Sequence, residues 1–306
     1  MHDLFSAVFE PGFFASPQVH VAAIVGGLVA IVSAVTGVFT VMRGQSFGGH
    51  ALGDVSAAGG SAALLIGVSP VAGFVGLGIA GAAVMDMIGV RRLRGRDLAT
   101  GIVLGTAIGL SALFLYLTST TGATTGATQQ ILFGSIFTTN SGTVLVVVIL
   151  GAVALAAIAV ACRPLLLTTV SPDIAAARGV PVRLVGLLYM LALAVSVGLS
   201  SLAIGAILST ALLIGPAAAA LRVTKRVARA VGLACLLGVA ATWVGILLAY
   251  DSYYWGASRE GLPVSFFIVA VVFVSYLVSG LPAAWAVRHR GVAAPAEAPA
   301  RERIVA

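Results

Sequence analysis

Two residues that could bind a metal ion lie four positions apart in residues 47–60, a segment of otherwise small and apolar residues. These are His50 and Asp54. In an α-helix, positions i and i+4 lie on the same face, so the imidazole and the carboxylate would point the same way. Imidazole nitrogen and carboxylate oxygen are ligands that suit Zn²⁺ or Mn²⁺. Because two ligands are too few for a tetrahedral site, two copies of the chain would have to supply four.

The composition excludes a water-soluble domain. Of the 306 residues, 60% are hydrophobic and only 9% are charged, and the mean hydropathy is +1.12. Apolar runs of about 20 residues recur along the chain, and each is long enough to cross a bilayer core. The 37 glycines suit close approach between helices in lipid. We therefore expect an all-α polytopic membrane protein.

Nine apolar runs are long enough to span the membrane, with eight spans as the alternative. They cover about residues 21–41, 51–68, 71–90, 98–117, 143–161, 184–199, 202–221, 230–250 and 263–287. The fifth run ends at Arg163-Pro164, and Ser200-Ser201 joins the sixth to the seventh. A charge-free polar stretch, residues 118–142, contains ILFGSIF and could form a short helix at the membrane surface.

The ends of the chain differ in character from this membrane domain, residues 21–290. Residues 1–20 predict an interfacial segment, and the Ala/Pro/Glu-rich residues 291–306 predict a disordered cytoplasmic tail. Every Lys and Arg except Arg259 falls in loops on one side of the nine-span arrangement. The positive-inside rule then places the N-terminus outside and the C-terminus in the cytoplasm. The basic residues are thus an orientation signal, and we expect no nucleic-acid partner.

This orientation sets the depth of the candidate metal ligands. Arg43 marks the cytoplasmic surface, so at 1.5 Å per residue His50 lies about 10 Å and Asp54 about 16 Å along a helix. A carboxylate near mid-membrane costs several kcal/mol unless it faces water, a partner or an ion. The alternative is that His50 and Asp54 bond each other, or neighbouring backbone, within a packed bundle.

A second informative stretch, residues 168–186, lies on the cytoplasmic side. Ser171 is a candidate N-cap, Pro172 suits the first helical position, and Asp173 would be stabilised by the helix dipole. Alanines carry this helix to Arg178, and Gly179 ends it. Two turns are too few for a helix that is stable alone. The segment is therefore either a helix that docks into a partner or an ordinary surface turn.

A third stretch, residues 200–222, contains residues that could line a transport path. Gly205, Gly215 and Pro216 interrupt the apolar run, and Ser209 and Thr210 lie in its middle. Proline removes a backbone hydrogen bond, so a kink or break beside a path is one interpretation. A proline kink used only for packing is the other. The sequence has no Walker A loop, catalytic triad or CxxC pattern, so we expect no enzymatic activity and no ATP hydrolysis by this chain.

Five motifs in order resemble one known family. They are FGGHALGDVSAAGGSAALLIG, ILFGSIF, VSPDIAAARGVPV, AIGAILSTALLIGPAAAA and SYYWGASREGLPVSFFIVAVVFV. Across about residues 20–285 the chain is similar to the membrane permease subunits of the metal-ion ABC importers, which take up zinc, manganese or iron. That family usually reads G-D-x-x-x-H-A after the first span. Here the order is reversed, because His50 precedes Asp54.

The resemblance implies a multi-pass permease of the plasma (inner) membrane, paired with a second copy in a homodimer. Its expected partners are two cytoplasmic ABC ATPase subunits, an extracytoplasmic metal-binding protein and the lipid bilayer. Residues 171–182 match the family's coupling helix, which transmits the motion of the ATPase. The metal would be a transported ion, with zinc expected first and then manganese or iron, and no cofactor would be bound permanently. The alternatives are a permease for a metal chelate or siderophore, and an ion-coupled secondary transporter without an ATPase.

Overall fold

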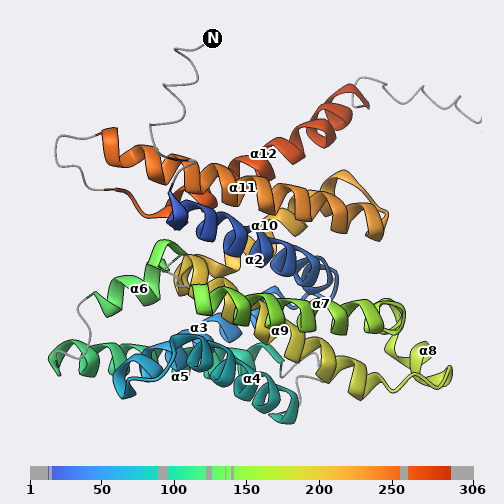
Figure 1. The fold of residues 1–306 in the computed structure, drawn as a ribbon. Coiled ribbons are helices and arrows are strands. Elements are labelled where there is room, and N and C mark those ends of the chain that lie inside the picture. The colour runs from blue at the N-terminus through green and yellow to red at the C-terminus, as the bar shows by residue number, and fades with distance from the viewer. Residues whose placement is uncertain are drawn as a thin grey trace, which may run out of the picture.

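All regular elements in the described part of the chain are helices (Figure 1). The computed structural model describes residues 13, 16–88, 96–121, 126–134, 136–138, 141–255 and 261–290. The predicted interfacial segment falls mainly on residues outside this set, and so does the predicted tail, residues 291–306. The chain folds as helices because backbone N–H and C=O groups in lipid must bond within their own segment.

Nine of these helices match the nine predicted spans. The long helices are α2 (Pro17–Met42), α3 (Ser46–Ile66), α4 (Pro70–Ile88), α5 (Arg96–Thr120), α7 (Ser141–Val170), α9 (Val182–Ile204), α10 (Ala206–Val223), α11 (Val227–Trp255) and α12 (Val264–Arg290). By length and hydropathy, eight of the described helices qualify as membrane spans. The exception is α3, whose 21 residues include His50, Asp54 and several glycines and serines that lower its hydropathy. Orientation across the membrane stays a prediction.

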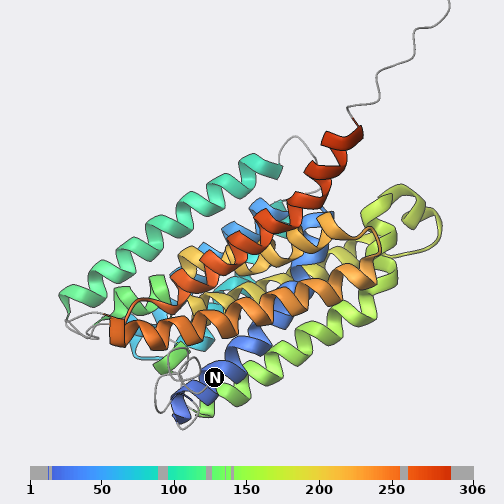
Figure 2. The ribbon, with the colours of Figure 1, turned by 90° about the horizontal axis from the view of Figure 1, so that it is seen from above.

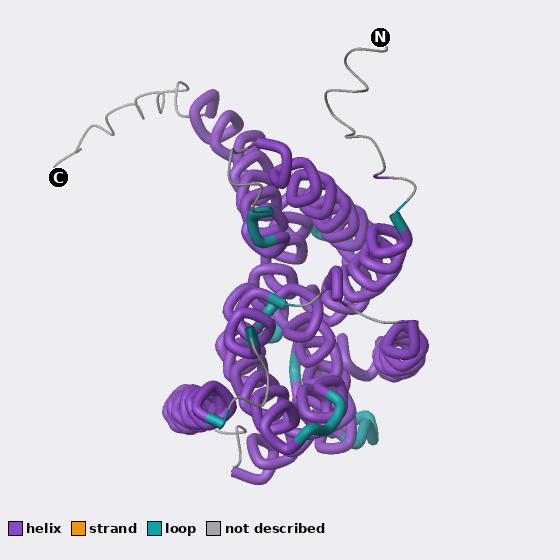
Figure 3. The backbone as a smooth tube through the Cα atoms, turned by 60° about the vertical axis from the view of Figure 1, so that its left-hand side comes forward, coloured by secondary structure: helices purple, strands orange, loops and turns teal. Residues whose placement is uncertain are grey.

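The helices form one bundle in which α9 is central. About 83% of the apolar stretch of α9 is buried, against 17% for α5, so α5 lies on the outside. Figure 2 shows α5 along one edge of the bundle and α7 along another. Figure 3 shows the same described backbone as helices joined by short loops. The polar stretch does contain a short helix, α6 (Ala127–Phe133), followed by the 3-10 turn η2 (Ile136–Thr138). Its position at the membrane surface stays a prediction.

Two predicted helix boundaries were wrong. Helix α7 does not end at Arg163-Pro164 but continues through the proline to Val170, because membrane helices tolerate the one backbone hydrogen bond that proline removes. The sixth and seventh spans separate at Gly205 and not at Ser200-Ser201. Gly205 has a φ of +89°, and a Cβ there would meet the carbonyl oxygen of Leu132 in α6. Only glycine suits both this backbone conformation and this close approach.

Buried hydroxyl groups join α2 to α9. The three hydrogen-bonded pairs are Ser33–Ser200 at 2.6 Å, Thr36–Ser196 at 2.8 Å and Thr40–Tyr189 at 2.8 Å, measured between side-chain oxygens. All six side chains are fully buried. Serine and threonine hydroxyls that bond across helices are a common means of association in lipid. The two helices are therefore held together along much of their length.

Close contact between α3 and α4 depends on two glycines that face each other. A Cβ on Gly73 would meet the carbonyl oxygen of Gly59, and a Cβ on Gly59 would meet that of Gly73. Any larger side chain at either position would push the two helices apart. Gly76, one turn further along α4, has no atom within 4 Å of its would-be Cβ.

We predict that Gly73→Val lowers the melting temperature of the detergent-purified protein, whereas Gly76→Val leaves it near the wild-type value. Overpacking a close helix contact typically costs about 1–3 kcal/mol. Both variants add the same side chain to the same helix, so helix propensity changes equally. Equal melting temperatures for the two variants would show that the Gly59–Gly73 contact does not hold α3 against α4.

Candidate functional site

His50 and Asp54 lie on one face of α3, as their spacing predicted. The imidazole Nε2 is 3.7 Å from Asp54 Oδ2, and the side chains are 40% and 16% exposed. This separation is too long for a hydrogen bond. Asp54 Oδ2 is buried and has no hydrogen-bond partner among the described residues. The two side chains are thus close but not hydrogen-bonded to each other, and Asp54 Oδ2 is available to bind an ion.

Helix α10 holds the imidazole in place. His50 Nδ1 lies 2.9 Å from the hydroxyl oxygen of Thr210. The two helices approach closely because Gly53 has no side chain, and a Cβ there would lie 3.3 Å from Ser209 Oγ. Of the two predicted path residues in the middle of α10, Thr210 contacts the His50–Asp54 pair, and Ser209 packs against Gly53 of the same helix α3.

The other two predicted path residues lie elsewhere on α10. A Cβ on Gly215 would meet the Val272 side chain of α12, and Pro216 is buried beside Gly238 of α11. The helix is continuous through both positions, so the break in this region is at Gly205. Gly215 and Pro216 therefore pack against α11 and α12, and a role for them in a path stays a prediction.

The geometry of the pair suits a first-row metal ion. Such ions bind imidazole nitrogen and carboxylate oxygen at about 2.0–2.2 Å. An ion at that distance from both His50 Nε2 and Asp54 Oδ2 spans their 3.7 Å separation at an angle somewhat wider than tetrahedral. No group of three or more His, Cys, Asp or Glu residues that could hold a metal is found among the described residues. One chain therefore offers half of a tetrahedral site.

We predict that Thr210→Val raises the metal concentration needed for half-maximal uptake by about 10-fold or more, in the range typical when a residue that orients a metal ligand is lost. When Nε2 binds a metal, Nδ1 carries the proton and donates it to Thr210 Oγ1, which fixes the ring orientation. Thr210→Ser keeps the hydroxyl and serves as the control. Equal behaviour of the valine and serine variants would exclude this orienting role.

The cytoplasmic-side segment forms the predicted short helix, α8 (Pro172–Ala177). Ser171 has extended backbone, and its hydroxyl accepts a hydrogen bond from the N–H of Ile174 at 3.3 Å. Pro172 occupies the first turn together with Asp173, and Arg178 is the C-cap. Gly179 then turns the chain with a φ of +77°. The local features expected of this helix are confirmed.

The exposed face of α8 includes a residue that the sequence reasoning did not single out. Ala175 is fully buried and anchors the helix, whereas Ile174 is 52% exposed. Asp173 and Arg178 are exposed as well. Val170, at the end of α7, is 82% exposed. An isoleucine that stands out of a short helix between charged groups is suited to contact with another protein.

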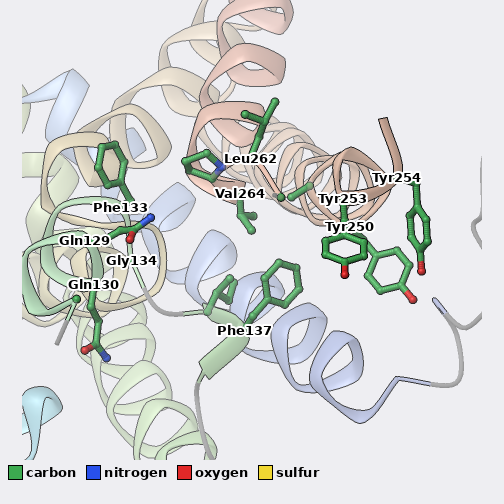
Figure 4. Close-up of a pocket in the computed structure, with 15 residues that line it drawn as sticks. Gln129, Gln130, Phe133, Gly134, Phe137, Tyr250, Tyr253, Tyr254, Leu262 and Val264 are labelled. Atoms are coloured by element: carbon green, nitrogen blue, oxygen red, sulfur yellow. The ribbon is translucent and has the colours of Figure 1, made fainter. Parts of the chain in front are cut away.

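A separate cavity of about 820 Å³ lies between α6 and η2 on one side and the ends of α11 and α12 on the other. Figure 4 shows Gln129 and Gln130 on one wall and Tyr250, Tyr253 and Tyr254 on the other. Among the described residues that line it, no side chain carries a charge, an imidazole or a thiol. The described part of the lining therefore offers no ligand for a metal ion, and His50 and Asp54 are not part of it.

Comparison with known proteins identifies the family. The model of the ABC 3 transport family matches residues 16–280. The chain belongs to the ABC 3 transport family. It is 31% identical over 226 residues to the "Manganese transport system membrane protein MntC" of Halalkalibacterium halodurans. This alignment covers 73% of this chain and 76% of that protein. It is 25% identical over 233 residues to the "High-affinity zinc uptake system membrane protein ZnuB" of Haemophilus influenzae. This alignment covers 76% of this chain and 88% of that protein.

Solved structures share the fold of this ABC 3 family member. The structure of PsaBC from Streptococcus pneumoniae in complex with Fab matches with a TM-score of 0.76 and 24% identity, over 92% of this chain and 95% of that one. An inward-facing putative metal-chelate type ABC transporter matches with a TM-score of 0.69 and 17% identity, over 90% and 88%. The predicted family is confirmed, and the chain is a multi-pass cell-membrane permease subunit, with ATP hydrolysis assigned to a separate subunit.

Proposed function

We propose that this chain is the permease of an ATP-driven importer that carries a divalent first-row metal ion into the cytoplasm. The observation that carries the proposal is the His50–Asp54 pair, with Nε2 and Oδ2 3.7 Å apart on one face of α3. The pair places an unpartnered carboxylate oxygen beside an imidazole whose other nitrogen is held by Thr210. A buried carboxylate in a membrane helix is a functional candidate, and an ion that binds both groups would offset its cost.

The names of the relatives favour manganese and zinc as cargo. The membrane proteins of the manganese transport systems of Halalkalibacterium halodurans and Listeria innocua are 31% and 27% identical to this chain. The membrane protein of the zinc uptake system of Haemophilus influenzae is 25% identical. The relatives do not support the expected preference for zinc, and we place Mn²⁺ first and Zn²⁺ second. Imidazole and carboxylate accept both ions, and selectivity in cells depends on metal availability as well as on affinity.

The proposed working unit contains two copies of the permease. Each chain supplies two ligands, so a second copy related by two-fold symmetry would complete a four-ligand site. The 40% exposure of the His50 side chain leaves it reachable from outside the single chain. We further propose that two ABC ATPase subunits engage α8 and that an extracytoplasmic binding protein delivers the ion to the opposite face.

The test is uptake by proteoliposomes that contain the permease and its ATPase, with the binding protein outside and ATP inside. We expect accumulation of radioactive manganese or zinc that stops when ATP is omitted. Uptake of a ferric siderophore in place of free metal would support the chelate permease instead. Metal uptake by the permease alone, driven by an ion gradient without ATP, would identify a secondary transporter. Either result would overturn the proposal.

A further inference from the structure

Arg43, at the end of α2, contacts both of the helices that flank α8. Its Nη1 donates hydrogen bonds to the hydroxyl oxygens of Thr168 at 3.1 Å and Thr169 at 3.3 Å. These threonines lie in the last turn of α7, directly before Ser171, and the N–H of Ser171 bonds to the Leu167 carbonyl at 3.0 Å. The arginine is therefore attached to the helix that leads into α8.

The same guanidinium also contacts the helix that leads out of α8. Arg43 Cζ lies 5.0 Å from the centroid of the Tyr189 ring, a cation–π distance. Tyr189 belongs to α9, is fully buried, and shares a 2.8 Å hydrogen bond with the Thr40 hydroxyl of α2. The Arg43 side chain thus connects α2 to α7 and α9, the helices before and after α8.

A short, hydrogen-bonded turn connects Arg43 to the helix with the candidate metal ligands. The N–H of Gln45 donates to the Thr40 carbonyl at 2.9 Å, and the N–H of Gly49 donates to the Gln45 carbonyl at 2.9 Å. His50 follows within the first turns of α3. A displacement of Arg43 would therefore be passed to the base of α3 rather than absorbed by a loose loop.

We propose that Arg43 is a positioning residue that couples α8 to the His50–Asp54 face of α3. The proposal rests on the function proposed above, in which α8 engages the ATPase. When α8 moves, the ends of α7 and α9 move with it, and the arginine carries that motion through the α2–α3 turn to the metal ligands. Packed side chains and hydrogen-bond networks carry energetic coupling between distant sites, and the contacts of Arg43 form such a network.

The contacts require the shape of arginine and not only its charge. A planar guanidinium donates to two hydroxyl groups while it stacks on an aromatic ring, whereas a lysine ammonium is a point charge. Arg43→Lys therefore keeps the charge at the end of α2 but weakens the connection. The chain offers a matched control in Arg222, in the last turn of α10. Its guanidinium lies 4.3 Å from the Tyr276 ring centroid and donates to the Tyr276 carbonyl at 3.3 Å. Those contacts join α10 to α12 and do not involve the helices that flank α8.

The test compares metal ions imported per ATP hydrolysed in proteoliposomes of the full complex. We expect Arg43→Lys to lower this ratio by about fivefold or more, the lower end of typical coupling between sites, and Arg222→Lys to leave it unchanged. Complex yield and melting temperature are measured for both, since a purely structural role would reduce assembly and ATPase activity together. An unchanged ratio in the Arg43→Lys complex would overturn the proposal.

A second variant keeps the proposal testable if Arg43→Lys does not assemble. Replacing both Thr168 and Thr169 with Val removes the acceptors and is expected to lower the ratio in the same way. Combining these changes with Arg43→Lys should add no further loss, because all of them break one connection. Additive losses would contradict the proposed link.

A thiol-labelling experiment that needs no transported metal tests the coupling role of Arg43 separately from the proposed function. Phe47, 44% exposed on α3, is replaced with Cys in a chain whose Cys162 and Cys235 are Ser. We expect ATP with vanadate to change the labelling rate of that thiol in the otherwise wild-type complex and not in the Arg43→Lys complex. A nucleotide response that persists in the variant, or is missing from both, would overturn the coupling role. A normal pattern of labelling in a complex that imports neither metal would overturn only the proposed function.

Discussion

Asp54→Asn and His50→Ala are each expected to reduce ATP-driven metal uptake by at least about 100-fold, beyond the 10–100-fold typical for residues that only support a ligand. Asn keeps the shape of the side chain but removes the charge that a divalent ion needs. Ala at position 50 removes the nitrogen 3.7 Å from Asp54 Oδ2. In a two-copy site His50→Ala deletes two of four ligands, and Asp54→Asn removes the charge from two of four. The measurement is the initial rate of radioactive metal entry into proteoliposomes.

Asp86→Asn provides the control for this experiment. Asp86 is another carboxylate in a long apolar helix, near the end of α4. We expect this variant to import metal at the wild-type rate. The ATPase should copurify with all variants, since none of the changes touches α8. Normal uptake by a His50→Ala/Asp54→Asn double variant would contradict the assignment of the site.

The parts of the structure that were predictable from sequence depend on local chemistry. Apolar runs of membrane length gave the nine long helices. Helix α8 was predictable almost residue by residue, because Ser171, Pro172 and Gly179 each act on backbone within a few positions. The His50–Asp54 contact also follows from helical periodicity alone. The features of α8 and the His50–Asp54 contact each involve residues within about one helical turn of each other.

The parts that were not predictable depend on contacts between distant segments. Ser200 is predicted to lie in a turn, because it is polar and joins two apolar runs. In the structure its hydroxyl is hydrogen-bonded to that of Ser33, 167 positions away. Its role is therefore to pack two helices together. The support that Thr210 gives to His50 joins residues 160 positions apart. Both depend on which helices become neighbours, and that is decided by packing over the whole bundle rather than by local preference.

For the same reason, the exposed face of α8 could not be predicted from the sequence. The sequence predicts a short helix but does not say which side of it is covered. Packing buries Ala175 and leaves Ile174 facing outward. A residue buried in its own protein contributes to folding, and an exposed apolar residue is available to a partner. Ile174 is therefore the position at which docking is tested without damage to the fold.

Ile174→Asp is expected to prevent ATPase copurification and with it all ATP-driven uptake. Burying an unpaired carboxylate in the centre of an interface removes an apolar anchor and adds a desolvation cost. Loss of a central anchor commonly costs about 2 kcal/mol or more, or roughly 30-fold in affinity. The permease should still fold, because Ile174 is 52% exposed in the single chain. Copurification from detergent extracts and the dissociation constant for the ATPase are the measurements.

Val223→Asp is the matched control. Val223 ends α10 and is 57% exposed, and the predicted topology places it on the same cytoplasmic side as α8. The same change from an exposed aliphatic residue to a carboxylate is made, away from the proposed docking helix. If both variants lose the ATPase, the effect is general to charge on this side of the membrane. If neither does, α8 is not the element through which the ATPase binds, and motion must reach the membrane helices by another route.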